Sequence, residues 1–259
     1  LWTVYISLTE WNGIGEPRFT GAQNYSMLFK DYMFWDALKN TVIYWITGVI
    51  LILALGLLIS GLLNYNRLRG KAFFKSATYL PNICAVIAMG IIFSMLFEKN
   101  TGLINEVIFA MGANKVDWLT GTRFSKIPVI ALNVWRNTPW FTMILLSGLL
   151  NISPEYYEAA KVDGANAFQR FFKITLPSLS NVMFFCFITL TADSWKIFNE
   201  PFMLQGPGTS NVSLFQYMYE SGFNVFKLGY ASSIGCMLTL ILLIVSVIQF
   251  IIRMKQGEV

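Results

Sequence analysis

Long apolar runs dominate this chain, and they set the strongest limit on how it can fold. An α-helix needs about 20 mainly apolar residues to cross a bilayer. Five runs meet that length, and the apolar start of the chain has the composition of the outer end of a sixth, truncated span. Because a backbone inside lipid must satisfy its own hydrogen bonds, these runs predict an all-α polytopic membrane protein with one transmembrane domain over residues 1–259. The expected spans are approximately residues 1–8, 41–63, 72–97, 127–150, 178–198 and 230–252.

Composition and missing residue types exclude several functional classes. The chain is 55% hydrophobic and only 13% charged, which is typical of a membrane protein and not of a soluble domain. Its net charge of +5 forms no extended basic patch, so an anionic bilayer explains the bias better than nucleic acid does. The absence of histidine excludes a Ser-His-Asp triad and a histidine-ligated zinc site. We therefore expect no catalytic residue and no metal ligand in this chain.

No cofactor is expected in the chain either. It lacks the G-x-x-x-x-G-K-[ST] sequence whose backbone cradles the phosphates of ATP. If ATP drives the function, the ATPase is another chain, and ATP and Mg are bound there.

The placement of lysine and arginine predicts which side of the membrane each loop faces. Short cytoplasmic loops carry an excess of these residues. The loop after the first full span is dense in basic residues and has no acid, and segment 151–177 and the C-terminal tail are also basic. By count the difference is small, with nine basic residues on this side and eight on the other. The dense basic run after the first full span therefore decides that this side faces the cytoplasm. The nine are Arg67, Arg69, Lys71, Lys75, Lys161, Arg170, Lys173, Arg253 and Lys255.

A polar island at residues 153–177 separates two apolar spans. Ser153 suits the N-cap of a helix and Pro154 its first position, while Gly164 can adopt the left-handed conformation that ends a helix. This pattern predicts a short helix over residues 154–163 with small residues on one face. A second short amphipathic helix follows, and a proline starts the next apolar run.

Polar residues inside the span 127–150 indicate a path for a polar substrate. An arginine at a helix centre costs at least about 2.5 kcal/mol on insertion scales, so Arg136 should face a polar cavity or a partner. It lies roughly 15 Å into the bilayer at 1.5 Å per residue. Asp193, near the outer third of the following span, is its candidate partner. The candidate path comprises Asn133, Trp135, Arg136, Asn137 and Trp140 together with Asp193, Trp195 and Asn199.

The arginine and the tryptophans both have alternative explanations. Arg136 can instead snorkel or form a charge pair that only fixes helix packing. A tryptophan face can stack on the C–H side of a sugar ring while amides bind its hydroxyl groups. Tryptophans also mark the membrane interface, so sugar contact by Trp135, Trp140 and Trp195 is one of two hypotheses.

Three further local features of the sequence predict a kink, a short helix and a turn. Pro81 removes a hydrogen bond within the span 72–97, so we expect it to kink that helix. A short interfacial helix is expected at residues 32–39, ahead of the first full span. The sequence QGPGTSN at residues 205–211 is typical of a turn outside the membrane.

The polar island resembles the EAA loop of binding-protein-dependent ABC importer permeases. The pattern is Glu158-Ala159-Ala160, Gly164 after three more residues, and Ile174-Thr175-Leu176-Pro177 after nine more. Other short sequences are similar to the carbohydrate branch of that family, the maltose-type permeases, and the resemblance covers nearly the whole chain. That branch usually starts its outer Gly/Pro turn with glycine, where this chain has Gln205. The further matching sequences are WNG at residues 11–13, FWDALKNT at 34–41, YLP at 79–81 and SGLLNIS at 147–153.

The resemblance implies a six-helix permease core with a cytoplasmic coupling helix. The residues it assigns to ATPase coupling are Glu158, Ala159, Ala160, Asp163, Gly164, Ile174, Leu176 and Pro177. The implied partners are a dimer of ABC ATPase subunits, a second and usually different permease subunit, and an extracytoplasmic substrate-binding protein. The implied location is the inner membrane of a bacterium or archaeon, with the coupling loop and the C-terminus in the cytoplasm.

The predicted function is therefore that of a permease subunit in an ATP-driven importer. It would pass a carbohydrate, such as a sugar, an oligosaccharide or a related polyol, into the cytoplasm by alternating access. The alternative is a self-contained secondary carrier or channel, in which residues 153–177 form only a surface loop. A membrane-embedded enzyme has little support, because Asp193 and Glu200 form no acid–base pair with a nucleophile.

Overall fold

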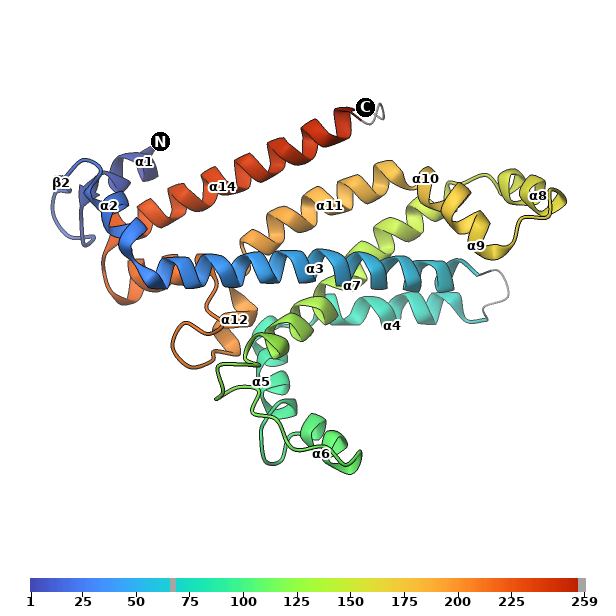
Figure 1. Ribbon diagram of the computed structural model, residues 1–259, viewed down its shortest axis with the longest axis horizontal. Helices are drawn as coiled ribbons and strands as arrows, with labels where there is room; N and C mark the ends of the chain where they lie inside the picture. The colour runs from blue at the N-terminus through green and yellow to red at the C-terminus, as the bar shows by residue number, and fades with distance from the viewer. Residues whose placement is uncertain (66–68, 256–259) are drawn as a thin grey trace.

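Four long helices form the body of the protein. The computed structural model describes residues 1–65 and 69–255, so Arg67 of the predicted basic loop lies outside the described residues. The long helices run broadly along the long axis in Figure 1, and the predicted all-α class is confirmed. They are α3 (Tyr32–Asn64), α7 (Lys126–Leu150), α11 (Ser180–Trp195) and α14 (Leu228–Lys255).

Helix α3 is longer than expected because it includes the predicted interfacial helix. The sequence predicted separate helices at residues 32–39 and 41–63, whereas α3 is continuous over 33 residues. No glycine or proline occurs in its first four turns, so nothing breaks the backbone between the two segments. The side chain of Asp31 accepts a hydrogen bond from the backbone N–H of Met33 and caps the helix. At 1.5 Å per residue the helix is about 50 Å long, which exceeds the hydrocarbon core of a bilayer.

The expected span 72–97 is broken into two helices at a sharp bend. Helix α4 (Lys71–Ile83) and helix α5 (Val86–Leu96) meet at 92°. Pro81 lies in the last turn of α4, and the bend itself falls at Cys84 and Ala85, whose backbones are extended. The prediction of a kink at Pro81 was therefore wrong in position, because the proline weakens the last turn and the chain changes direction only after it.

A second bend of 67° lies between segments 167–178 and 180–203. Among the described residues, two helices, α3 and α14, are long and apolar enough to cross a membrane, and up to four such segments result if each bent pair is one span. Helix α7 has 25 residues but is not one of them, because polar residues interrupt its apolar sequence. The expected segment 1–8 forms only the short helix α1 (Trp2–Ser7), which packs against α14.

The main hydrophobic core lies between α3, α7 and α11. Ile52 from α3, Phe141 and Leu145 from α7, and Leu190 from α11 are each at most 2% exposed and pack in one cluster. Gly148 permits the close approach of α7 to α11, since a Cβ atom there would lie 2.8 Å from Leu179 Cδ2. The packing of these three helices positions the residues between them.

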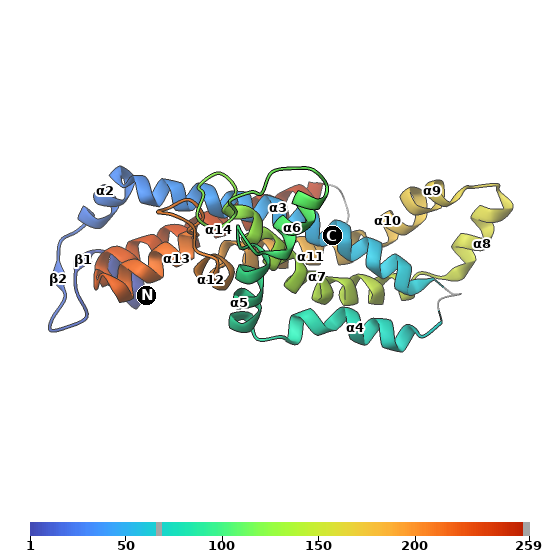
Figure 2. The same ribbon diagram turned by 90° about the horizontal axis from the view of Figure 1, so that it is seen from below.

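Short elements form the two ends of the molecule. In both views, α8 and α9 stand at one end and the small hairpin at the other (Figures 1 and 2). The hairpin pairs β1 (Thr9–Glu10) antiparallel with β2 (Arg18–Phe19), in a segment that the sequence left without regular structure. The remaining short elements are α2 (Gln23–Lys30), α6 (Leu103–Ala110), α8 (Pro154–Val162), α9 (Ala167–Arg170), η1 (Phe171–Thr175), α10 (Leu176–Ser178), α12 (Asn199–Met203), α13 (Leu214–Tyr219) and η2 (Glu220–Asn224).

Candidate functional site

The polar island folds as a helical projection at one end of the molecule, which we call the 153–177 projection. The side chain of Ser153 accepts a hydrogen bond from the N–H of Glu155, and Pro154 occupies the first turn of α8. At the other end of α8, Gly164 has a φ of +76°. The N–H of Gly164 bonds to the carbonyl of Lys161, and the next N–H bonds to the carbonyl of Ala160. This pair of bonds is the Schellman closure that a left-handed glycine permits. The predicted helix and its glycine turn are confirmed.

The second half of the projection is less regular than the sequence suggested. Asn166 and Gln169 form a reciprocal capping box at the start of α9. Within one turn the helix becomes the π-helix η1, and α10 follows. The hydroxyls of Tyr157 and Thr175 lie 3.0 Å apart and join α8 to η1. The projection is therefore tied together internally.

The outer surface of the projection is apolar as well as polar. Val162 is 89% exposed, Phe168 72% and Tyr156 62%, with no other part of the described chain covering them. Of the residues predicted to couple to an ATPase, Glu158, Ala159, Asp163, Gly164 and Pro177 are exposed, while Ala160, Ile174 and Leu176 are half-buried. Exposed apolar side chains grouped on a small projecting element are typical of a surface that binds another protein.

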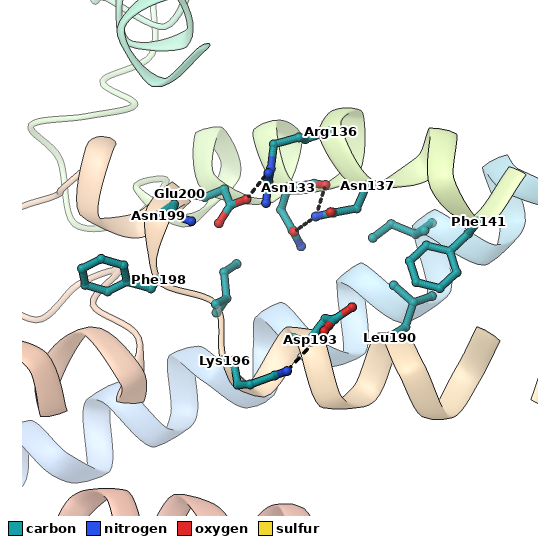
Figure 3. A pocket seen from close by; sticks show the side chains of 13 residues that line it. Asn133, Arg136, Asn137, Phe141, Leu190, Asp193, Lys196, Phe198, Asn199 and Glu200 are labelled. Carbon is teal, nitrogen blue, oxygen red and sulfur yellow. Dashed lines mark hydrogen bonds and ion pairs between the residues drawn. The ribbon is translucent and has the colours of Figure 1, made fainter. Parts of the chain in front are cut away.

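A polar cavity of about 330 Å³ lies between α7, α11 and the segment leading into α12. Five of the eight residues of the candidate path line it, and Figure 3 shows their side chains converging from the two walls. These five are Asn133, Arg136, Asn137, Asp193 and Asn199. The other lining residues are Ile52, Phe141, Leu190, Ser194, Lys196, Ile197, Phe198 and Glu200.

The charged partner of Arg136 is Glu200, and the predicted partner Asp193 was wrong. Arg136 Nε lies 3.1 Å from Glu200 Oε1, and the Glu200 side chain is only 4% exposed. Asp193 Oδ1 instead lies 3.4 Å from Lys196 Nζ, and the Asp193 side chain is 60% exposed. The reason is geometric: α11 ends at Trp195, and the chain turns toward α7 just before Glu200. The sequence offers no signal for Glu200 as the partner, because its burial depends on the turn between α11 and α12.

Amides form the remaining polar wall of the cavity. Asn137 Nδ2 donates to Asn133 Oδ1 at 2.6 Å and to its backbone carbonyl at 3.0 Å. These residues are one helical turn apart, so α7 alone orients both groups. Together with Asn199 they offer donors and acceptors without adding charge.

The three tryptophans of the candidate path do not line the cavity. Trp195 is 2% exposed and packs against Trp45, with ring centroids 5.9 Å apart. Trp135 packs against Phe93, and Trp140 is exposed at the outside of α7. None of these three tryptophans lines this cavity, because they lie on other faces of their helices, and sugar contact by them stays a prediction. Phe141 and Phe198 line the cavity instead, at its opposite ends in Figure 3.

Asn211, in the predicted turn at residues 205–211, links α3 to the start of α7. The side chain of Asn211 accepts from the N–H of Gly206 at 2.8 Å and donates to the carbonyls of Leu204 and Ser125. Tyr44 of α3 donates its hydroxyl proton to the Asn211 carbonyl at 2.7 Å. These bonds connect the turn to α3 and to the start of α7.

The 153–177 projection connects the two walls of the cavity. Helix α7 carries Arg136 and leads into α8 after only residues 151–153, and the projection returns through α10 into α11. From Arg136 to Leu150 the helix spans about 21 Å, at 1.5 Å for each of 14 residues. Helix α7 therefore connects the projection to one wall, and the segment from η1 through α10 connects it to the other wall across the 67° bend before α11. In the described part of the chain, no group of acidic and cysteine side chains could hold a metal ion.

Curated relatives and solved structures are similar to most of this chain. The lactose transport system permease protein LacF of Rhizobium radiobacter is 31% identical and covers 90% of this chain and 80% of its own length. The arabinooligosaccharides transport system permease protein AraP of Bacillus subtilis is 32% identical and covers 91% of this chain and 76% of its own. The fold is similar to that in the crystal structure of a bacterial alginate ABC transporter in complex with an alginate pentasaccharide-bound periplasmic protein. The TM-score is 0.79 at 20% identity, with 92% of this chain and 84% of that chain covered.

The family assignment follows from the match over the helical body. The family model described as a binding-protein-dependent transport system inner membrane component matches residues 52–256, which include the 153–177 projection and both cavity walls. The prediction of a transport subunit, and not of an enzyme or a self-contained carrier, is confirmed by that match. The chain belongs to the family of inner membrane components of binding-protein-dependent transport systems.

Proposed function

We propose that this chain is a permease subunit of an ATP-driven importer that moves a carbohydrate into the cytoplasm by alternating access. The observation that carries the proposal is the connection of an exposed docking projection to both walls of a polar cavity. Such an arrangement lets a force applied at one place change the shape of a site elsewhere in the same subunit.

Two lines of support favour a carbohydrate. The relatives LacF and AraP are named for lactose and arabinooligosaccharide transport. The cavity offers amides, charged groups and two phenylalanine faces, which suit the hydroxyls and the C–H faces of a sugar. Its volume of about 330 Å³ is near the small end of the usual range for ligand pockets, roughly 300–1,000 Å³, so this subunit would contact a short saccharide segment.

The 153–177 projection would serve as the coupling element to an ATPase. Ala159 and Ala160 permit close contact with a partner, Glu158 and Asp163 offer charge, and Gly164 fixes the turn. When two ATPase subunits close on ATP and Mg, the projection would move, and α7 and α11 would carry that movement to the cavity. The nucleotide and the metal belong to the ATPase, because this chain lacks a phosphate-binding loop.

The remaining partners follow from the single projection. A pair of ATPases needs two coupling elements, so a second permease subunit is expected, and a different chain would form a heterodimer. A substrate-binding protein would dock on the opposite end, near the hairpin of β1 and β2. This assignment places the projection and the C-terminus in the cytoplasm, in agreement with the basic residues of those segments.

Photocrosslinking at two matched positions tests this arrangement. Val162 on the projection and Ile14 in the hairpin are 89% and 81% exposed, so a photoreactive residue at either site should not disturb packing. In membranes that contain the whole transporter, we expect position 162 to crosslink to the ATPase and position 14 to the binding protein. An ATPase crosslink at position 14, or its absence at position 162, would contradict the proposed orientation and coupling.

A further inference from the structure

The charged side chains that line the cavity form two ion pairs. The lining contains two cations, Arg136 and Lys196, and two anions, Asp193 and Glu200. Each cation is within 3.4 Å of one of the anions. The cavity therefore carries no net charge from the residues of this chain that line it, despite its polar character.

The two ion pairs are not equivalent. The Lys196–Asp193 pair has side chains that are 52% and 60% exposed, so water screens it and its partners separate at little cost. The Arg136–Glu200 pair has side chains that are 25% and 4% exposed. Glu200 depends on Arg136 for compensation of its charge, because burial of an unpaired carboxylate is strongly unfavourable.

An anionic ligand would disturb the buried pair. A carboxylate that approached Arg136 would compete with Glu200 for the guanidinium and would bring a second negative charge close to it. A neutral polyol has no such conflict. Its hydroxyls can donate to the carboxylates and accept from Arg136, Lys196 and the amides while both ion pairs remain intact. Figure 3 shows one oxygen of Glu200 directed at Arg136 and the other directed toward the open space between the walls.

From this geometry we infer that the cavity selects neutral saccharides and discriminates against saccharides that carry an acidic group. Glu200 is the specificity-determining residue, because it occupies the guanidinium that an acidic sugar would need. The inference rests on the proposed function, carbohydrate import, and narrows the substrate class at the same site.

Binding of matched neutral and acidic sugars tests the inference. The transporter is assembled with its partner permease and ATPases in nanodiscs, without the binding protein, so that selection by that protein does not enter. Isothermal titration calorimetry is run with cellobiose, lactose and maltose and with the corresponding disaccharides in which one CH₂OH group is a carboxylate. We expect each acidic form to bind at least about tenfold more weakly than its neutral counterpart, because it competes with a buried ion pair.

The variant Glu200→Gln should reduce the difference in affinity between the neutral and the acidic sugars. The amide keeps the shape of the side chain but releases Arg136, so the acidic sugars should gain affinity relative to the neutral ones. The matched control is Glu106→Gln, which removes the acid of the exposed Lys115–Glu106 pair away from the cavity and should keep the wild-type ratio. Where Glu200→Gln fails to assemble, the wild-type ratio alone decides the inference.

The outcomes separate the inference from the proposed function. Acidic sugars that bind as tightly as their neutral counterparts to the wild-type transporter would overturn the inference and leave carbohydrate import standing. An unchanged ratio in a well-assembled Glu200→Gln variant would overturn the role of Glu200. If neither form of any sugar binds, the carbohydrate assignment itself is contradicted, and the neutral class with it.

Discussion

At the scale of single residues, Asp31 connects the N-terminal end of α3 with α13 and α14. Its carboxylate caps α3 through the N–H of Met33 and accepts hydrogen bonds from the hydroxyls of Tyr217 in α13 and Tyr230 in α14. Burial acts to raise the pKa of Asp31, but the hydrogen bonds from both tyrosines and the backbone outweigh it, so the pKa lies below its ordinary value of 3.8. The ionised form therefore stabilises the fold.

We predict that Asp31→Asn lowers the thermal stability of the assembled transporter at neutral pH. Because the folded-state pKa is depressed, the contribution of Asp31 is fully present above the unfolded value of about 3.8 and is lost as the pH falls through the folded pKa. The difference between the melting temperatures of the variant and the wild type, measured in detergent between pH 3 and 7, should thus be constant near neutral pH and shrink below about pH 3.8. Glu16→Gln, a substitution of an exposed acid in the hairpin loop, is the control. A stability difference that stays constant with pH would contradict the account.

Residue types were predicted more reliably than residue partners. The sequence predicted that Arg136 faces a polar cavity or a partner, because a charge deep in a span is costly in lipid. It assigned Asp193 as the partner of Arg136 and missed Glu200. Which acid reaches Arg136 depends on where α11 ends and how the chain turns after it. It also assigned the tryptophans to the path by type, although each faces away from the cavity. Side-chain direction requires the tertiary packing that a single sequence does not contain.

At the scale of elements, α7 and α11, which carry the two walls of the cavity, pack closely near the end of α7. Gly148, near the end of α7, lies against Leu179 and Val182 at the start of α11. A Cβ atom there would lie 2.8 Å from Leu179 Cδ2 and 3.1 Å from Val182 Cγ2. Leu179 is fully buried, and valine is stiff at χ1, so neither can move aside easily.

We predict that Gly148→Val separates α7 from α11 and destabilises the subunit by about 1–3 kcal/mol, the usual cost of overpacking. The loss should appear as a lower melting temperature in detergent and as reduced transport. Gly61→Val in α3 is the matched control, since an added Cβ meets no atom within 4 Å there. Equal melting temperatures for the two variants would show that the glycine at position 148 has no packing role.

The long apolar helices and the 153–177 projection were predictable because strong local signals define them. Serine, proline and glycine at fixed positions specify α8, and apolar length specifies α3 and α14. The 92° bend between α4 and α5, the π-helix η1 and the hairpin of β1 and β2 were not, because each is set by packing against other elements. Helix α7 is a different case. The polar residues that line the cavity also lower its apolar content, so α7 is not among the helices apolar enough to cross a membrane.

At the scale of the whole molecule, the proposed function depends on the connection between the projection and the cavity. The projection stands at one end and the hairpin at the other, and the chain enters the projection from α7 and leaves it toward α11 (Figure 1). These two helices carry the walls of the cavity. We propose that this connection converts ATP hydrolysis by a partner into a change in the cavity.

Uptake and ATP hydrolysis measured together on Gly164→Asp test that claim most directly. Gly164 has a φ of +76°, and a Cβ added there meets no atom of this chain within 4 Å, so the variant should assemble while the turn after α8 is distorted. Gly112→Asp is the matched control, because Gly112 has a φ of +85° and equally open space but lies after α6. In proteoliposomes with the binding protein, we expect Gly164→Asp to lose uptake and substrate-stimulated ATPase activity while Gly112→Asp retains both. Normal uptake by an assembled Gly164→Asp transporter would contradict the coupling role of the projection.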